Sequence, residues 1–254
     1  MRVLVTRPAR EAQQWVADLR QAGIEAAPLP LLEIGPAPDP APVRRAWQEL
    51  SAVDAVMFVS ANAVDHFFLF KPQQQPTLFA RAWAPGPGTR DALLRAGVPP
   101  HSIDAPAVDA EQFDSQALWQ QVGGQLVSGQ RLLVVRGGGA NGNGVGRDWL
   151  GAQLAACGVA VDTVVAYTRK PPTWTQAQLQ LAQRSAVDES LWLFSSSEAI
   201  ANVRKLLPHQ GWKDARALAT HPRIAEAAAA AGFGVVSLSR PTLADVVASI
   251  ESIR

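Results

Sequence analysis

Short runs rich in leucine and β-branched residues alternate along this chain with segments that carry apolar residues at helical spacing. Residues 2–6, 25–30, 55–60, 131–136, 159–167, 191–195 and 235–239 are predicted strands, and residues 9–22, 90–96, 148–156 and 224–231 are predicted helices. Such alternation is typical of parallel sheets covered by helices. We expect the predicted helices to end at the glycines that follow them, Gly23, Gly97, Gly158 and Gly232.

Motifs of the first half of the chain return in the second half. The segment RVLVTR at 2–7 resembles RLLVVR at 131–136, and FVSANAV at 58–64 resembles FSSSEAI at 194–200. Gly86-Pro87 and His221-Pro222 each precede a predicted helix. The last two pairs of motifs lie about 135 positions apart, which favours two similar units over a solenoid. The sequence therefore predicts two similar α/β domains.

Two proline-rich stretches, at 36–42 and 169–171, are predicted to be stiff extended linkers. Residues 1–35 are too few to bury a core alone, so we expect them to pack with 172–254 as a discontinuous first domain. Residues 43–168 then form the second domain. The alternative is two sequential domains divided near residue 127.

Composition narrows the class of protein. Of 254 residues, 48% are hydrophobic and 18% charged, which excludes wholesale disorder, and no apolar run is long enough to span a membrane. A formal net charge of +1 gives no global field for binding nucleic acid. The single cysteine, Cys157, and the absence of a secretory signal at the N-terminus indicate a cytoplasmic protein. We expect Cys157 to pack in the core.

No metal or nucleophile motif stands out. His66, His101, His209 and His221 are scattered, and neither a P-loop nor a Gly-x-Ser-x-Gly elbow occurs. The segment from Gly137 to Gly142 satisfies G-x-G-x-x-G after a predicted strand, a weak signal for a dinucleotide.

Several turns between a predicted strand and a helix carry small or hydroxyl residues, whose backbone N–H groups would attract carboxylate or phosphate. Ser60 and the serines at 195–197 stand in such turns, although each also fits an ordinary helix cap. Arg7 and Arg136 follow equivalent strands, where each would either clamp a carboxylate or form a structural ion pair. Together these turns predict a ligand with several acid groups.

Tyr167 is the only tyrosine of the chain and ends a predicted strand directly before a linker. Its phenol would project into a cleft between the domains, or it would be a half-buried residue at a strand end. With a reference pKa near ~10, a phenol stays protonated at neutral pH and is able to donate to a leaving oxygen.

Taken in order, these motifs resemble those of uroporphyrinogen-III synthases. The carrying residues are VLVTRP at 3–8, FVSANAV at 58–64, GPGT at 86–89, RG at 136–137, VAY at 165–167 and FSSS at 194–197. The resemblance spans the chain and implies two α/β domains joined by two extended strands, the first domain being discontinuous. It also implies an enzyme, a lyase of haem biosynthesis, that closes linear hydroxymethylbilane into uroporphyrinogen III with loss of water and inversion of ring D. The family uses no metal or organic cofactor.

The resemblance also implies roles for particular residues. The substrate is a linear tetrapyrrole with eight carboxylates, held in a cleft between the domains largely by backbone amides. Candidate binding residues carried over by motif are Ser60, Ala61, Asn62, Ala63, Gly86, Thr89, Arg136, Gly137, Ser196 and Ser197. Arg7 and His221 join them from the turns described above. Tyr167 corresponds to the family tyrosine thought to assist departure of the hydroxyl, which would give an azafulvene cation that ring D attacks through a spiro intermediate.

One turn departs from the family pattern. Where Gly-Pro-x-Thr is usual, this chain reads His221-Pro222-Arg223-Ile224, so His221 would either donate to a carboxylate or cap the helix. We expect a monomer. Two other functions stay open from the residues alone: a two-lobed protein that binds an acidic ligand without chemistry, and a nucleotide-dependent enzyme using Gly137 to Gly142.

Overall fold

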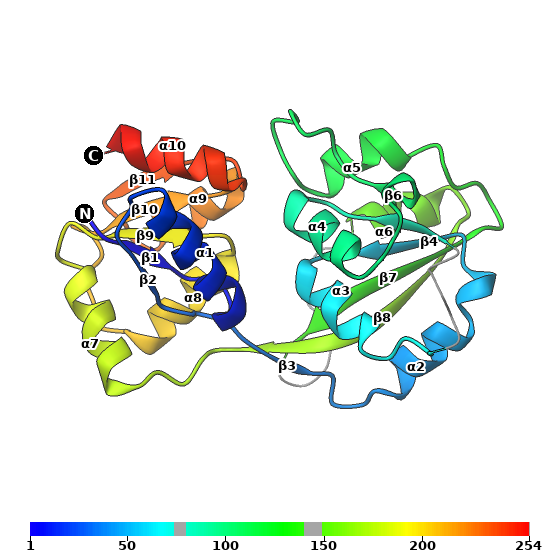
Figure 1. Ribbon diagram of the computed structural model, residues 1–254, viewed down its shortest axis with the longest axis horizontal. Coiled ribbons are helices and arrows are strands. Elements are labelled where there is room, and N and C mark those ends of the chain that lie inside the picture. Colours follow the sequence, from blue (N-terminus) through cyan, green and yellow to red (C-terminus); the bar gives the residue numbers. More distant parts are fainter. Residues whose placement is uncertain (74–79, 140–148, 254) are drawn as a thin grey trace. The chain divides into compact units, whose positions relative to one another are not determined.

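A computed structural model describes residues 1–73, 80–139 and 149–253 (Figure 1). The chain divides into two compact units. One combines both ends of the sequence, Met1–Glu33 and Lys170–Arg254, and is called the terminal unit below. The other, Ile34–Arg169, is called the central unit.

The terminal unit contains a sheet in the order β11-β10-β9-β1-β2, in which all neighbouring strands run parallel. Its strands are β1 (Val3–Val5), β2 (Ala26–Pro28), β9 (Leu191–Phe194), β10 (Arg216–Ala219) and β11 (Val235–Leu238). Its helices are α1 (Ala9–Gln21), α7 (Gln176–Ser185), α8 (Ser197–Leu206), α9 (Pro222–Ala230) and α10 (Leu243–Ile253). Because β1 pairs with β9, the N-terminal segment completes a sheet whose other strands come from the end of the chain.

The central unit contains a sheet in the order β3-β8-β7-β4-β5-β6, parallel from β8 through β6. Its strands are β3 (Glu33–Pro36), β4 (Ala55–Phe58), β5 (Arg81–Trp83), β6 (Ile103–Asp104), β7 (Arg131–Gly138) and β8 (Ala160–Lys170). Its helices are α2 (Ala41–Gln48), α3 (Ala61–Phe68), α4 (Pro87–Arg95), α5 (Ser115–Val122) and α6 (Trp149–Ala156), with short 3-10 turns at Leu50–Ala52 and Pro100–Ser102.

Alternation of side chains along each strand builds a core on both faces of each sheet. In the terminal unit, Leu4, Trp192 and Phe194 pack with residues of α7, α8 and α9, whereas Val3 and Val5 pack with residues of α1 and α10. The central sheet repeats this arrangement (Figure 1): one face packs with α2, α3 and α4, and the other with α5 and α6. Both sheets are therefore covered on both faces, and their open parts are the strand ends.

The α/β prediction with two parallel sheets is confirmed, and each of the strands and helices predicted from hydrophobic periodicity overlaps an observed one. The four glycines expected to end helices all adopt positive φ, between 74° at Gly23 and 96° at Gly232. Strands β3, β5, β6 and β10 were not among the predicted strands.

The proline-rich stretches, predicted to be stiff extended linkers, lie partly within regular elements. Pro36 ends β3, and Pro42 lies in the first turn of α2, where a missing N–H costs no hydrogen bond. Arg169 and Lys170 continue β8. The chain thus passes between the units along two neighbouring strands, and Lys170 forms an ion pair with Glu33 at 2.9 Å.

A buried amide fastens the segment after β2 to helix α8. Asn202 is 2% exposed and its Nδ2 donates to the backbone oxygen of Leu31 at 2.9 Å. We expect Asn202→Ala to lower the free energy of unfolding by about 1–3 kcal/mol, because the buried carbonyl loses this donor. Denaturant unfolding measures the change. Gln14→Ala, which removes only an exposed bond to Asp18, should change stability by less than about 0.5 kcal/mol, and equal losses in both variants would contradict the argument.

Candidate active site

The turns of the central unit that the sequence singles out follow neighbouring strands. Ser60 follows β4, Gly86 follows β5, and Arg136 and Gly137 stand near the end of β7. Tyr167 lies in β8, next to β7 in the sheet. Since these strands are parallel, their carboxyl ends meet at one edge, which is where ligands bind in such sheets. This edge of the central sheet is the candidate active site.

Ser60 begins helix α3 and is its N-cap. Its extended backbone turns the chain out of β4, and its Oγ accepts from the backbone N–H of Ala63 at 3.1 Å. Ala61, Asn62 and Ala63 form the first helical turn. The Ala63 amide is therefore used by Ser60, and its methyl group is buried in the core. The amides of Ala61 and Asn62 also lie at the helix start, where N–H groups lack acceptors within the helix.

The hydroxyl of Ser60 also meets the phenol of Tyr167. Ser60 Oγ and the Tyr167 hydroxyl oxygen are 3.0 Å apart, and either is able to donate. The Tyr167 side chain is 2% exposed, whereas Ser60 is half-buried. The ring of His66, also on α3, stacks on the Tyr167 ring with centroids 5.6 Å apart. Helix α3 thus holds the tyrosine with a cap serine and an imidazole.

The position of Tyr167 differs from the sequence prediction. The strand does not end there, because β8 runs on to Lys170, and the residue is buried rather than half-buried. Its ring belongs to the core cluster between the sheet and α3, which includes Val64 and Phe67. An aromatic ring in a parallel sheet gains by packing against the covering helix, so only the hydroxyl end needs a polar partner.

Gly137 makes room for this ring. Residues Arg136 and Gly137 pair with Val165 and Tyr167, so Ala166 is an extra residue in β8 and the ladder bulges there. A Cβ at Gly137 would stand 2.5 Å from the Cζ of Tyr167 and 2.9 Å from its hydroxyl oxygen. Only glycine lets β7 approach the phenol this closely.

The two arginines at equivalent positions of the repeat have different surroundings. Arg7 lies over the ring of Trp15 at 4.3 Å and pairs with Glu11 at 3.3 Å. Burial lowers the pKa of the Arg7 guanidinium, and Glu11 opposes this shift through its charge and hydrogen bond. Arg136 lies in β7 beside Gly137 and is half-buried. The Nε atoms of both are buried without a hydrogen-bond partner among the described residues.

Gly86 and Thr89 belong to the start of α4. Gly86 is the N-cap, with extended backbone and Pro87 directly after it, and its carbonyl accepts from the Thr89 amide at 3.2 Å. Thr89 is 6% exposed, so its side chain faces the interior. A ligand at this turn would therefore meet the backbone of Gly86 rather than the Thr89 hydroxyl.

The terminal unit repeats these turns with other residues. Ser196 is the N-cap of α8 and accepts from the Glu198 amide at 3.2 Å, as Ser60 does in α3. Ser197 is the first residue of α8, and its buried Oγ has no hydrogen-bond partner among the described residues. His221 is the N-cap of α9, and its Nδ1 accepts from the Arg223 amide at 3.1 Å. The structure therefore shows His221 in its capping role.

The predicted residues thus fall into two sets. The central set joins Ser60, Tyr167 and Gly137 in direct contact, with Arg136 adjacent in β7 and Gly86 one strand away. The terminal set consists of Arg7, Ser196, Ser197 and His221. Sequence reasoning did not place His66 in the site, and its one signal is a position six residues after Ser60 on the same helix.

Comparison with known proteins identifies the family. The family model described as uroporphyrinogen-III synthase HemD matches residues 13–248. The chain belongs to the uroporphyrinogen-III synthase family. These enzymes are lyases that cyclise hydroxymethylbilane.

Named relatives and solved structures agree with this family. The uroporphyrinogen-III synthase of Synechococcus elongatus is 28% identical over 218 residues, which cover 81% of this chain and 74% of the relative. That of Proteus mirabilis is 27% identical over 191 residues, covering 75% and 92%. The fold matches uroporphyrinogen-III synthetase of Helicobacter pylori (TM-score 0.59, 17% identity, 100% of both chains). It also matches a mutant synthase of Thermus thermophilus (TM-score 0.56, 18% identity, 99% and 98%).

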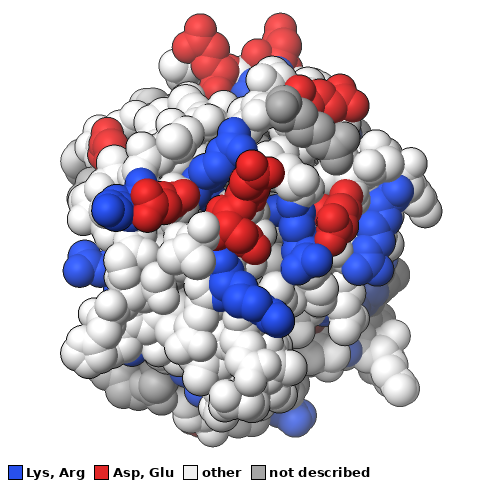
Figure 2. Space-filling view, turned by 90° about the vertical axis from the view of Figure 1, so that its left-hand side faces the viewer, with Lys and Arg blue, Asp and Glu red and all other residues white. Residues whose placement is uncertain are grey.

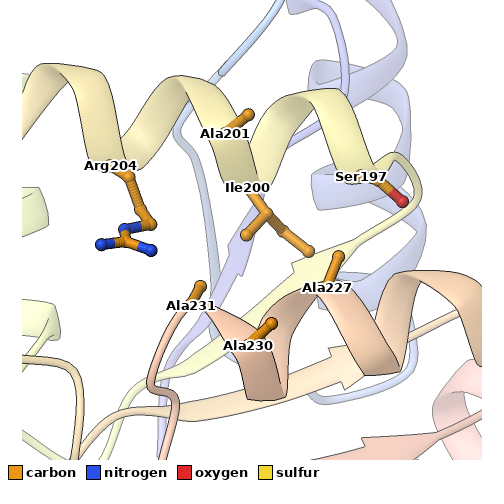
Figure 3. Close-up of a pocket in the computed structure, with 7 residues that line it drawn as sticks. All are labelled: Ser197, Ile200, Ala201, Arg204, Ala227, Ala230 and Ala231. Atoms are coloured by element: carbon orange, nitrogen blue, oxygen red, sulfur yellow. The ribbon is translucent and has the colours of Figure 1, made fainter.

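One groove of this family member lies outside the central set. It has a volume of about 430 Å³ and lies between α8 and α9 of the terminal unit (Figure 3). Ile200 points from α8 toward Ala227 and Ala231, and the Arg204 guanidinium lies at the side (Figure 3). Its lining is mostly aliphatic, with the Ser197 hydroxyl and the Arg204 guanidinium as its polar groups.

Features that would indicate another class do not appear in the parts of the chain that the structure describes. Within those parts there is no group of three metal-binding side chains and no helix long and apolar enough to cross a membrane. Residues 140–148, which include the second half of the segment from Gly137 to Gly142, lie outside the described residues. Figure 2 shows one face on which Lys and Arg alternate with Asp and Glu instead of forming a patch of one sign.

The interpretation of Cys157 as core packing is wrong. The residue follows the last turn of α6 and is exposed. The buried leucines of that helix are Leu150 and Leu154. Cys157, three residues after Leu154, lies beyond the helix in the turn before Gly158, which has positive φ.

Proposed function

We propose that this chain cyclises hydroxymethylbilane to uroporphyrinogen III, with loss of water and inversion of ring D. The observation that carries the proposal is the family match over residues 13–248, nearly the whole chain. The contact between Ser60 and Tyr167 supports it, because it places two hydroxyls at the sheet edge where parallel α/β proteins bind ligands.

The reaction requires assistance to break the carbon–oxygen bond of the leaving hydroxyl, and control over which carbon of ring D closes the macrocycle. A hydroxyl is a poor leaving group, so a hydrogen-bond donor at its oxygen accelerates departure, typically by about 10²–10⁴-fold. We propose that the Ser60–Tyr167 pair supplies this donor and that the cation formed is an azafulvene. Folding the bilane so that the substituted carbon of ring D attacks is a matter of positioning, which supplies about 7–11 kcal/mol where geometry is good.

The remaining predicted residues would hold carboxylates. Amides at the starts of α3, α4, α8 and α9 carry the positive end of each helix dipole, which favours anions. We propose that these turns hold carboxylates of the substrate, with Arg7 and Arg136 as cationic partners. The two units are then the two domains expected from the sequence. We further propose that the enzyme is monomeric and cytoplasmic and that it needs no cofactor or nucleic acid.

Product analysis tests this function directly. Purified protein is incubated with hydroxymethylbilane, and the type I and type III isomers are separated after oxidation to porphyrins. We expect type III in excess, because the uncatalysed reaction closes the ring without inversion and gives type I. Type I alone, at the rate of a protein-free control, would contradict the synthase function and favour a binding protein for an acidic ligand.

A further inference from the structure

We infer that Ser60 is the residue that touches the departing hydroxyl, and that Tyr167 acts behind it as the proton source. This relay deepens the proposed function and rests on it. The inference starts from burial: Tyr167 is 2% exposed and packed in the core, whereas Ser60 is half-buried at the start of α3. Of the two hydroxyls, that of Ser60 is therefore the one that a substrate at the sheet edge meets.

The hydrogen-bonding capacity of Ser60 also supports a relay in which Ser60 contacts the substrate and Tyr167 donates to Ser60. A serine hydroxyl has one donor hydrogen and two acceptor lone pairs. One lone pair of Ser60 accepts from the Ala63 amide at 3.1 Å. When Tyr167 donates at 3.0 Å, the second lone pair is filled, and the Ser60 hydrogen is left to point toward the leaving oxygen.

The surroundings keep both oxygens in place. The Ala63 bond fixes Ser60 Oγ against the first turn of α3, and Gly137 on one side with His66 on the other fixes the Tyr167 ring. The hydroxyl pair also lies at the N-terminus of α3, whose dipole favours negative charge on the phenol oxygen as the proton leaves.

The relay balances in atoms and charge. The carbon–oxygen bond of the bilane hydroxymethyl group breaks as the Ser60 Oγ–H proton moves to the leaving oxygen, which departs as water. The Tyr167 O–H proton moves to Ser60 Oγ, leaving a phenolate and an azafulvene cation. Ring closure then releases one proton from the tetrapyrrole, which returns to the phenolate and restores both hydroxyls.

A double-mutant cycle distinguishes the relay from direct donation by Tyr167. We expect Ser60→Ala and Tyr167→Phe each to lower kcat by about 10²-fold or more with a small change in KM. The double variant should be no slower than Ser60→Ala, because in the relay the phenol acts on the substrate through Ser60. Ser60→Thr, which keeps the hydroxyl, should recover most of the rate. If Tyr167→Phe costs the same factor in both backgrounds, or Ser60→Ala keeps full turnover, the relay is wrong.

A variant of a second N-cap residue tests whether Ser60→Ala lowers kcat only because it removes a helix cap. Asp114 is the N-cap of α5 in the same unit and accepts from the amides of Gln116 and Ala117. Asp114→Ala should lower thermal stability about as much as Ser60→Ala does, since each removes a helix cap, but leave kcat unchanged. Equal losses of kcat in the two cap variants would assign Ser60 a structural role only and overturn the relay.

Because Tyr167 is the only tyrosine, its ionisation is directly visible as tyrosinate absorbance in the intact protein. Ser60 is able to donate to the phenolate, so Ser60→Ala should raise the titration midpoint by about one pH unit. His66, stacked on the ring, and Arg136, beside Gly137, are unchanged in this comparison. An unchanged midpoint overturns the relay without involving turnover, whereas wild-type protein that forms only type I product overturns the proposed function and the relay with it.

Discussion

Tyr167→Phe is expected to lower the turnover of hydroxymethylbilane by about 10²–10⁴-fold, the usual contribution of a proton donor at a leaving group. The spontaneous type I isomer would then dominate the product. The substitution removes one oxygen and leaves the ring, which keeps its packing in the central core and its stacking on His66. The measurement is the initial rate of type III formation, with the ratio of isomers at completion.

Folding should be almost unaffected by this change. The hydrogen bond to Ser60 that is lost joins two neutral groups and is worth about 0.5–1.5 kcal/mol, and Ser60 still accepts from Ala63. A matched control is Thr168→Val, one residue further along β8, which removes the hydroxyl that donates to the Pro36 oxygen at 3.1 Å. That variant should lose similar stability and keep full turnover. A Tyr167→Phe protein with wild-type turnover would remove the tyrosine from the mechanism.

The fold was predictable because its signals are local. Hydrophobic periodicity marked the buried strands, and glycines at positive φ marked the helix ends. The repeat was also real in structural terms: Ser60 and Ser196 cap equivalent helices, and so do Gly86 and His221, each followed by proline at the first helical position. Each of these features depends only on neighbours in sequence.

The site was only partly predictable because its decisive contacts are long-range. The Ser60–Tyr167 bond joins residues 107 positions apart, and no local pattern reports such a pairing. Both sequence interpretations of Tyr167 placed it at a strand end, but the β7–β8 ladder extends past it and shifts register between Arg136 and Gly137. Likewise, the prolines at 36–42 predicted an extended linker, although Pro42 is compatible with the first turn of α2.

Gly137→Ala is expected to disturb the site through packing alone. Its Cβ would stand 2.5, 2.7 and 2.9 Å from the Cζ, Cε2 and hydroxyl oxygen of Tyr167, distances that force the ring to move. The ring has little room, since His66 stacks on it and the core surrounds it. Overpacking of this kind costs about 1–3 kcal/mol of stability. Displacement of the phenol from Ser60 should also lower turnover, because a catalytic group misplaced by about 1 Å costs about 10²-fold.

Gly124→Ala is the matched control, because among the described residues no heavy atom lies within 4 Å of the position its Cβ would take. It should keep both stability and turnover. The two readouts of Gly137→Ala, denaturant unfolding and the rate of type III formation, separate the effects, since a purely global loss of stability is overcome at low temperature while a displaced phenol is not. Turnover of Gly137→Ala that equals that of Gly124→Ala in the cold would show that the close approach of β7 to the phenol has no part in catalysis.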